Sequence, residues 1–319
     1  MLELEKISKI YKTGTFGGKK LLAVNNVSFD VKDGEVISLI GESGSGKSTI
    51  GKMILRLISI SSGMIRLNGV DVATLKGRAL KDYYRNVQGV FQDPFSSYNP
   101  IFKADRIFRI IREEFFPEIN YREWNKKIDS SLKAVGLNPD EVLSKFPHQL
   151  SGGQLQRFLI ARALLLDVQF LVADEIISML DASTRIDVLN LLAELKSRGL
   201  SILFITHDLS LGYYISERAV ILYRGCVVEM GATEQIYCHP LHPYTKMLMV
   251  SVPRLDRKWE KVEMKLKAKY LELPSGCVYY ERCPFADKDK DCARRPILIE
   301  VGNDHFVACS HYMEVNERV

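Results

Sequence analysis

The chain has 319 residues, of which 46% are hydrophobic, and its 44 basic and 39 acidic side chains give a net charge of +5. This length predicts about two domains with enough apolar material for a large core, and the nearly even charge gives no indication of a nucleic-acid partner. No apolar stretch reaches the roughly eighteen residues of a membrane span, and the acidic start is unlike a secretory signal. We therefore expect a cytosolic protein that can dock on a membrane protein.

The first thirty residues predict two paired strands, at 2–11 and 22–31, on either side of a loop rich in Gly and Lys. Tyr11 lies at the end of the first strand. An aromatic side chain there is usually an edge-packing residue, but its flat ring also offers a surface on which adenine can stack.

A glycine-rich loop follows the apolar run Val36 to Ile40 and precedes the segment 50–58, in the order strand, loop, helix. Its residues are Gly41, Glu42, Ser43, Gly44, Ser45, Gly46, Lys47, Ser48 and Thr49. Glycines without a Cβ let backbone N–H groups turn toward an anion at a helix N-terminus. Lys47 supplies a cation for β/γ-phosphate oxygens and Ser48 a hydroxyl that can bind Mg²⁺. A flexible loop with an unrelated lysine is the alternative, and the flanking strand and helix favour nucleotide binding.

Short strands are predicted within 63–72, with a turn at Asn68-Gly69, and another strand at 87–91. Gln92 follows that strand. Its amide can contact Mg²⁺ or a water without cancelling charge, although the Gln-Asp-Pro sequence that it opens is also compatible with a simple turn.

The hydrophobic period changes to a helical one between Asp105 and Val135, which predicts an inserted helical region. We expect its apolar stripes to be buried: Ile107, Ile110, Ile111, Phe115, Trp124, Ile128, Leu132 and Val135.

Ser151-Gly152-Gly153-Gln154 precedes an apolar segment at 158–166 that predicts a helix. A helix N-terminus of this composition can bind an anion, and Ser151 can instead simply cap the helix.

The segment 170–173 predicts a buried parallel strand that ends in Asp174-Glu175. Carboxylates at such a strand end can hold Mg²⁺ through water (Asp174) and deprotonate an attacking water (Glu175). Acidic pairs after strands also cap the next element, but the phosphate loop elsewhere in the chain favours the functional interpretation.

An amphipathic helix is predicted at 183–197, with a buried face of Ile186, Leu189, Leu192 and Ala193. A strand at 201–206 leads to His207, and two strands at 220–223 and 227–230 predict a hairpin around Arg224-Gly225.

The order of these motifs resembles the ATP-binding subunits of ABC transporters over roughly residues 1–240. The motifs that carry the resemblance are the phosphate loop, Gln92, Leu150 to Gln154, Asp174-Glu175, Ser178 to Asp181 and His207. It implies an α/β fold: a phosphate-loop ATPase core with a mixed sheet, an antiparallel β edge, an inserted helical subdomain at about 94–166 and a small Cys-rich extension.

The resemblance implies that Tyr11 stacks on adenine, that Gly41 to Thr49 bind the phosphates, and that Gln92 links Mg²⁺ to the transport channel. Ser151 to Gln154 would complete the ATP site of an opposite subunit in a head-to-tail dimer, with Asp181 as a contact across the dimer.

Glu175 would be the catalytic carboxylate and His207 the γ-phosphate switch. The implied catalytic set is Glu175, His207, Gln92 and Lys47, and the implied Mg²⁺ set is Ser48, Gln92 and Asp174. One departure is Ile176, which stands where the family usually has proline. Because proline would hold Glu175 extended, its absence relaxes that backbone and predicts a turnover below the family's norm.

The segment 239–245, followed by Leu248 and Pro253, resembles the oligopeptide/dipeptide/nickel branch of these importers. Its two histidines allow a metal site, but its prolines and apolar neighbours favour a rigid corner. We expect an ATP-binding domain at 1–253, then a charged linker at 254–273 within a C-terminal module at 254–319.

Four cysteines lie in that module: Cys277, Cys283, Cys292 and Cys309. A reducing cytosol argues against disulfides, and four thiolates in a short segment can enclose one metal centre. The resemblance favours a [4Fe–4S] cluster; zinc, whose sites usually show closer cysteine pairs, and four inert buried thiols are the alternatives. Cys292 is the least certain ligand because the stretch 286–291 is longer than usual.

The expected function is that of one ATP-binding and ATP-hydrolysing subunit of an importer for peptides, nickel complexes or oligosaccharides. The implied partners are transmembrane permease subunits, a second and related ATP-binding chain, and indirectly a solute-binding protein. The implied location is the cytoplasmic face of the cell membrane. A soluble ABC ATPase that acts on nucleic acid or ribosomes is the alternative function, and a redox or iron sensor is the alternative role of the cysteines.

Overall fold

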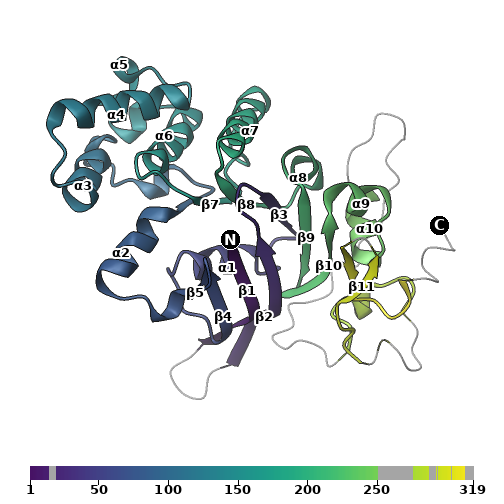
Figure 1. Ribbon diagram of the computed structural model, residues 1–319. Helices are drawn as coiled ribbons and strands as arrows, with labels where there is room; N and C mark the ends of the chain where they lie inside the picture. The colour runs from purple at the N-terminus through teal and green to yellow at the C-terminus, as the bar shows by residue number, and fades with distance from the viewer. Residues whose placement is uncertain (14–18, 251–275, 287–291, 293, 303, 313–319) are drawn as a thin grey trace. The chain divides into compact units, whose positions relative to one another are not determined.

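The chain forms two compact units in a computed structural model, and each unit is described by itself (Figure 1). The first comprises 1–31, 36–73 and 204–319, and the second 32–35 and 74–203. The residues that the structure describes are 1–13, 19–250, 276–286, 292, 294–302 and 304–312. The predicted linker at 254–273 lies outside the described residues, as does most of 286–291.

An antiparallel sheet of four strands occupies the N-terminal part of the first unit, in the order β2-β1-β4-β5. Its strands are β1 (Leu2–Thr13), β2 (Lys19–Val31), β4 (Ser62–Leu67) and β5 (Val70–Asp71). The predicted pairing is confirmed, with Leu2 opposite Val31 and Tyr11 opposite Leu21. The turn between β4 and β5 is at Asn68 and Gly69, whose φ angles of 51° and 79° explain the choice of Asn-Gly.

A mixed sheet also lies in the first unit, in the order β11-β12-β10-β9-β3. Its strands are β3 (Val36–Ile40), β9 (Arg218–Tyr223), β10 (Cys226–Ala232), β11 (Ile299–Gly302) and β12 (His305–Val307). Strands β3 and β9 are parallel, whereas the other neighbours are antiparallel. The predicted hairpin between β9 and β10 turns at Arg224 and Gly225, both with positive φ. Strand β8 (Ser201–Thr206) crosses from the second unit to the first.

The helices of the first unit are α1 (Lys47–Ile54), α8 (Leu209–Ile215), α9 (Thr233–Cys238) and α10 (Pro243–Val250). Helix α1 begins three residues before the predicted segment and ends at Ile54 instead of Ile58. It begins early because Gly46, in the left-handed conformation with φ 104°, allows the loop to turn directly into the helix.

The segment between α9 and α10 is a rigid corner, as predicted. The fully buried carboxylate of Glu229 accepts hydrogen bonds from the N–H groups of Leu241 (2.8 Å) and His242 (2.9 Å), and lies 2.8 Å from Nε2 of His305. Burial lowers the pKa of His242 to about 3, so its ring is neutral. His239 is exposed, whereas His242 is buried, so the two do not form a common site.

The second unit contains the parallel pair β6 (Val87–Val90) and β7 (Phe170–Asp174), and every residue of β7 is buried. Its helices are α2 (Gly77–Asn86), α3 (Arg106–Phe115), α4 (Tyr121–Ala134), α5 (Pro139–Val142), α6 (Gly152–Leu164) and α7 (Ala182–Ser197). Helices α3 to α6 lie together in Figure 1, and α4 packs against both α5 and α6. The inserted helical region is therefore confirmed.

The apolar stripe of α4 is buried as predicted, but two other predicted faces were partly wrong. In α3 Ile111 is buried together with Phe108, which stacks on Phe158 at 4.7 Å, whereas Ile110 is 44% exposed. In α7 Ile186 and Ala193 are exposed. The buried face of α7 consists of Val188, Leu189, Leu191, Leu192 and Leu195.

No helix of the described residues is both long and apolar enough to cross a membrane.

Candidate nucleotide-binding site

The phosphate loop connects β3 to α1, and its glycines are required by close backbone contacts. A Cβ on Gly41 would lie 2.1 Å from the carbonyl oxygen of Leu222, and one on Gly46 would lie 2.5 Å from that of Ala23. Gly44, with φ 81°, has open space around it. The loop therefore needs glycine for packing at two positions and for conformation at a third.

The polar groups of the loop are arranged for an anion. Lys47 is only 4% exposed, and its Nζ donates to the carbonyl oxygens of Gly41 (2.7 Å) and Glu42 (3.0 Å). The hydroxyl of Ser45 is buried without a hydrogen-bond partner among the described residues. The N-cap residue Gly46 has no side chain with which to cap α1, so it leaves the N–H groups of the first turn available to a ligand. These features fit a bound phosphate chain.

Tyr11 and His207 also belong to the first unit. Tyr11 is half-buried on β1, with Nζ of Lys9 5.3 Å from the centre of its ring. His207 is exposed directly after β8. The neighbouring Asp208 caps α8 through the N–H of Ser210 at 2.8 Å, so it is occupied locally.

Asp174 and Glu175 lie together in the second unit, at the carboxyl end of β7. Asp174 is 6% exposed, and Glu175 is half-buried with φ of 50°. The carbonyl oxygen of Glu175 accepts from both N–H (3.1 Å) and Oγ (2.8 Å) of Ser178. Proline at position 176 would disfavour this left-handed conformation, whereas the buried Ile176 permits it. The relaxed backbone predicted at Glu175 therefore takes the form of a left-handed turn, of the kind that concentrates at functional sites.

The Ser-Gly-Gly-Gln segment forms the N-terminus of α6 with a reciprocal capping box. Oγ of Ser151 accepts from the Gln154 N–H at 3.1 Å, and Oε1 of Gln154 accepts from the Ser151 N–H at 2.9 Å. A Cβ on Gly153 would lie 2.7 Å from Cγ2 of Thr184, so this glycine is needed for packing against α7. Ser151 thus caps α6 and is itself exposed, while its part in the ATP site of an opposite subunit stays a prediction.

Two further predicted residues lie at element ends in the second unit. Gln92 is exposed two positions after the end of β6. Asp181 caps α7, accepting from Oγ of Ser183 at 2.6 Å and from the N–H of Thr184 at 3.0 Å. These hydrogen bonds hold the pKa of Asp181 well below its ordinary value. Because the predicted site residues fall in separate units, their meeting in one ATP site stays a prediction.

The four predicted cysteine ligands line one small pocket in the first unit. Cys277, Cys283, Cys292 and Cys309 all contribute to its wall, together with His242. Burial raises the pKa of the Cys283 thiol to about 11 and that of Cys309 to about 12. No group of three or more His, Cys, Asp or Glu side chains placed to hold a metal ion occurs within the described parts of the chain. The predicted metal centre is therefore not confirmed.

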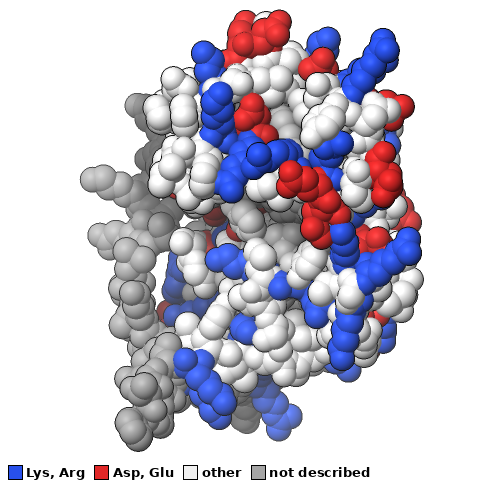
Figure 2. Space-filling model, turned by 90° about the vertical axis from the view of Figure 1, so that its left-hand side faces the viewer, with Lys and Arg blue, Asp and Glu red and all other residues white. Residues whose placement is uncertain are grey.

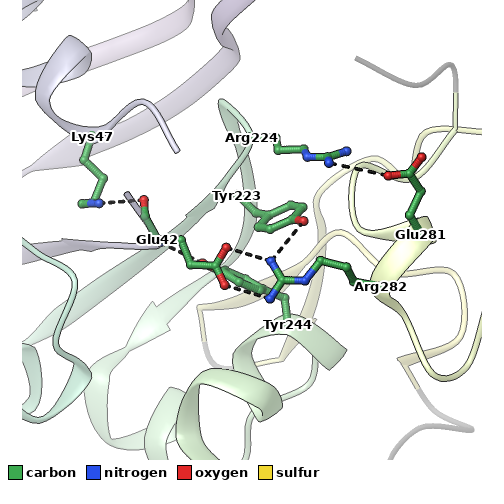
Figure 3. Close-up of polar contacts among 7 residues, drawn as sticks. All are labelled: Glu42, Lys47, Tyr223, Arg224, Tyr244, Glu281 and Arg282. Atoms are coloured by element: carbon green, nitrogen blue, oxygen red, sulfur yellow. Dashed lines mark hydrogen bonds and ion pairs between the residues drawn. The ribbon is translucent and has the colours of Figure 1, made fainter. Parts of the chain in front are cut away.

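Contacts from the C-terminal part of the chain reach the phosphate loop, and no sequence pattern indicated them. The hydroxyl of Tyr244 accepts from the N–H of Glu42 at 2.9 Å, and Arg282 forms two hydrogen bonds with the Glu42 carboxylate (Figure 3). These partners lie 202 and 240 positions from Glu42 in the chain, so they share no local pattern with it. Only the place of Arg282 immediately before Cys283 could have drawn attention to it.

The strand, glycine loop and helix, with a buried lysine at the helix start, define a phosphate-loop nucleotide-binding protein. The family model for ABC transporters matches residues 24–178, and that for the C-terminal region of oligopeptide/dipeptide transporters matches 228–292. The oligopeptide transport ATP-binding protein AppF of Bacillus subtilis is 40% identical over 98% of this chain and 97% of its own. A Brucella ovis protein named for ATP binding in peptide import is 40% identical over 97% of both chains.

A solved structure shows the same fold. The ATP-binding cassette MJ0796, a dimer in a post-hydrolysis state with ADP and Pi, matches 73% of this chain and 99% of its own. Its TM-score is 0.65 at 29% sequence identity. The chain belongs to the ABC transporter family, as an ATP-binding protein that hydrolyses ATP.

Proposed function

We propose that the chain is one of the two ATP-binding subunits of an importer for oligopeptides or a related small solute. The observation that carries this proposal is the presence, on one chain, of an ABC phosphate loop and the C-terminal region of oligopeptide/dipeptide transporters. The relatives named for peptide transport, each 40% identical to this chain, favour peptides over nickel complexes and oligosaccharides.

ATP would bind with its adenine on Tyr11 and its phosphates in the loop Gly41 to Thr49. Lys47 would neutralise phosphate oxygens, while Ser48, Gln92 and Asp174 would hold Mg²⁺, which supplies positive charge for the phosphates. The buried Lys47 supports this assignment, as does the Ser45 hydroxyl, which has no partner within the described residues.

Hydrolysis would need a general base and a second chain. Glu175 would deprotonate the attacking water, and His207 would contact the γ-phosphate. The N-terminus of α6, at Ser151 to Gln154, of which Ser151 is exposed, would complete the site of an opposing subunit, with Asp181 at the dimer contact. The dimeric MJ0796 cassette supports this head-to-tail arrangement, and we propose a related but different chain as the second subunit.

The proposed domains are an ATP-binding domain at 1–253, with a helical subdomain at about 94–166, and a linker with the Cys-rich module at 254–319. The C-terminal family match at 228–292 covers the end of the first of these and part of the second.

A groove in the second unit is suited to a permease segment. It has a cavity of about 230 Å³, and its apolar wall includes Phe102, Ile107, Ile110 and Leu159. The buried Tyr98 hydroxyl and the Nε atoms of Arg106 and Arg162, from residues that line it, have no hydrogen-bond partner among the described residues. Apolar side chains beside such polar groups fit a docked protein segment that supplies both contacts. Ser97, Tyr98 and Asn99 also line the groove. They belong to the segment 93–99 after Gln92, through which we propose that the permease senses ATP. The proposed location is thus the cytoplasmic face of the membrane.

Substituting Ile110→Ser is expected to reduce copurification of the chain with its permease by about fivefold or more, because it removes apolar area from the groove. ATP binding by the isolated chain should be unchanged. The matched control is Ile186→Ser, since Ile186 is similarly exposed (48% against 44%) on α7 outside the groove. Equal copurification of the two variants would exclude the groove as the docking site.

A soluble ABC ATPase acting on nucleic acid or ribosomes is less well supported. The face drawn in Figure 2 carries acidic as well as basic side chains, so it is not a uniformly basic surface. Copurification with membrane subunits would favour the importer, and tight, strongly salt-dependent nucleic-acid binding would favour the alternative.

For the cysteine pocket we propose a [4Fe–4S] cluster held by Cys277, Cys283, Cys292 and Cys309. Four thiols around one pocket provide the donor set, one for each iron. A single zinc ion is the alternative, but zinc sites usually contain cysteine pairs separated by about two to four residues, and Cys277, Cys283, Cys292 and Cys309 are spaced more widely. Such a cluster would either cross-link the module structurally or serve as a redox sensor. All four cysteines would bind it as thiolates, and the positive charge of the iron would then have to overcome the burial that raises the thiol pKa of Cys277, Cys283 and Cys309.

The anaerobically purified chain is expected to show visible absorption and about four iron atoms per chain, both lost in the variant Cys283→Ser. Cys238→Ser is the matched control, because Cys238 is exposed on α9 and does not line the pocket. Stoichiometric zinc without iron would point to a structural zinc site. The absence of both metals would indicate that the four cysteines are thiols that hold no metal.

A further inference from the structure

An ion pair joins the cysteine-rich module to the phosphate loop within the first unit. Nη1 and Nη2 of Arg282 lie 2.8 and 2.9 Å from the two carboxylate oxygens of Glu42, a two-point contact between guanidinium and carboxylate (Figure 3). The side chains are 19% and 37% exposed, so the pair is partly shielded from water. Such parallel contacts restrict orientation as well as supplying attraction.

Every polar group of Glu42 has a hydrogen-bond partner, and those of its N–H and its carboxylate come from distant parts of the chain. Its N–H donates to the hydroxyl of Tyr244 at 2.9 Å, and its carbonyl oxygen accepts from Nζ of Lys47 at 3.0 Å. Arg282 holds its carboxylate. Figure 3 shows these contacts meeting at one loop residue, so the conformation of the loop at Glu42 depends on the C-terminal part of the chain.

Arg282 is itself fixed in place. Its guanidinium lies 5.8 Å from the ring centres of both Tyr223 and Tyr279, and Tyr279 is only 3% exposed. A guanidinium carries its charge throughout the physiological pH range. The preceding residue, Glu281, lies 3.6 Å from Arg224 of the β9–β10 hairpin, so the short 3-10 helix Tyr280–Arg282 makes a second ionic contact, in this case with the hairpin.

The charge of Glu42 matters because the loop must accept a triphosphate. A carboxylate without a counterion beside that site would repel the phosphates, since like charges disfavour each other. The pairing with Arg282 neutralises Glu42 and directs its carboxylate toward the module. The residue after Arg282 is Cys283, which lines the four-cysteine pocket.

We propose that Arg282 is a positioning residue for the phosphate loop: by pairing with Glu42, it sets the affinity for ATP and makes that affinity depend on the folded cysteine module. This inference rests on the proposed function, in which the loop binds the phosphates of ATP. It assigns to the C-terminal module a direct part in nucleotide binding.

The test is a double-mutant cycle on the intact chain, with ATP affinity measured by equilibrium titration. Arg282→Ala should weaken ATP binding by about three- to tenfold, because it leaves the Glu42 carboxylate unpaired. In the Glu42→Gln background, which has no carboxylate to neutralise, the same substitution should have no further effect. Raising the salt concentration should reduce the difference in ATP affinity between the wild type and Arg282→Ala, because salt screens the repulsion between the Glu42 carboxylate and the phosphates. Arg282→Lys should be intermediate, since an ammonium keeps the charge but not the two-point geometry.

The matched control is Arg294→Ala, which removes the same charge from an exposed position of the module. It should bind ATP as wild type does. An unchanged affinity in Arg282→Ala, or an equal loss in the wild-type and Glu42→Gln backgrounds, would overturn the inference. Either result would leave the proposed function intact, because that function is tested separately by Lys47→Ala.

Discussion

Replacing Glu175 by glutamine is expected to lower the rate of ATP hydrolysis by about 10² to 10⁴, or roughly 3 to 5.5 kcal/mol in the activation barrier, with little change in ATP affinity. Glutamine has nearly the same size as glutamate but cannot accept a proton from the attacking water. The backbone at Glu175, with its positive φ and two hydrogen bonds from Ser178, should tolerate the change because neither feature involves the side chain. The measurement is phosphate release by the wild-type and variant chains, reconstituted with their partner subunits.

The control for this prediction is Glu194→Gln, which neutralises an exposed carboxylate on α7 that forms an ion pair with Arg198. Exposed ion pairs of this kind contribute little to the stability of the fold, so the rate of ATP hydrolysis should be unaffected. Near-normal turnover in Glu175→Gln would remove Glu175 from the role of general base. A loss of ATP binding in the same variant would instead indicate that the carboxylate contributes to binding ATP and not only to the hydrolysis step.

Local patterns in the sequence were sufficient for most of the fold. The alternation in 2–11 and 22–31, the Asn-Gly and Arg-Gly turns, and the apolar run before the phosphate loop each depend on residues close together in the chain. The structure confirms the strands and turns that they predicted. The Ser151 cap was likewise readable from its neighbours, because a capping box spans only four residues.

The predictions that failed concern which side of a helix is buried. A stripe at helical spacing identifies an apolar face but does not say what covers it. Ile110 belongs to such a stripe and is exposed in the groove, while Phe108 fills the core against Phe158. In α7 the buried face is rotated from the predicted one, leaving Ile186 exposed. In α3, the exposed apolar residue Ile110 lines the groove that we propose as the docking site.

The contacts of Glu42 could not be predicted because they join residues far apart in sequence. Arg282 and Tyr244 lie 240 and 202 positions from Glu42 in the chain, and only the tertiary fold brings them to the phosphate loop. A charged residue in a glycine-rich loop gives no sign of its counterion. The cysteine pocket was easier, since four cysteines in one short segment already indicated convergence, and the structure places all four around one pocket.

Substituting Lys47→Ala is expected to weaken ATP binding by about 10- to 100-fold, because a charged hydrogen-bond donor to the phosphates contributes roughly 1.5 to 3 kcal/mol. Lys47 is buried and already aimed into the loop, with Nζ bonded to the carbonyl oxygens of Gly41 and Glu42. In the ATP complex, phosphate oxygens would accept from Nζ of Lys47 in place of these carbonyl oxygens or together with them. The loss should be large for ATP and ADP and small for AMP, which lacks the β- and γ-phosphates.

Folding of this variant must be verified, since removing the buried lysine takes away a donor to the carbonyl oxygens of Gly41 and Glu42, although that of Glu42 still accepts from the Ser45 N–H. Circular dichroism and the thermal midpoint serve that purpose. The second control is Lys52→Ala, which removes an exposed lysine from the same helix, α1, away from the loop. It should bind ATP with wild-type affinity.

The measurement that tests the central claim most directly is an equilibrium titration of the intact chain with ATP and Mg²⁺, comparing the wild type with folded Lys47→Ala. A saturable single site in the wild type, weakened at least about tenfold in the variant, is the result that we predict. Equal affinity in the two chains would contradict the assignment of Gly41 to Thr49 as the phosphate-binding loop.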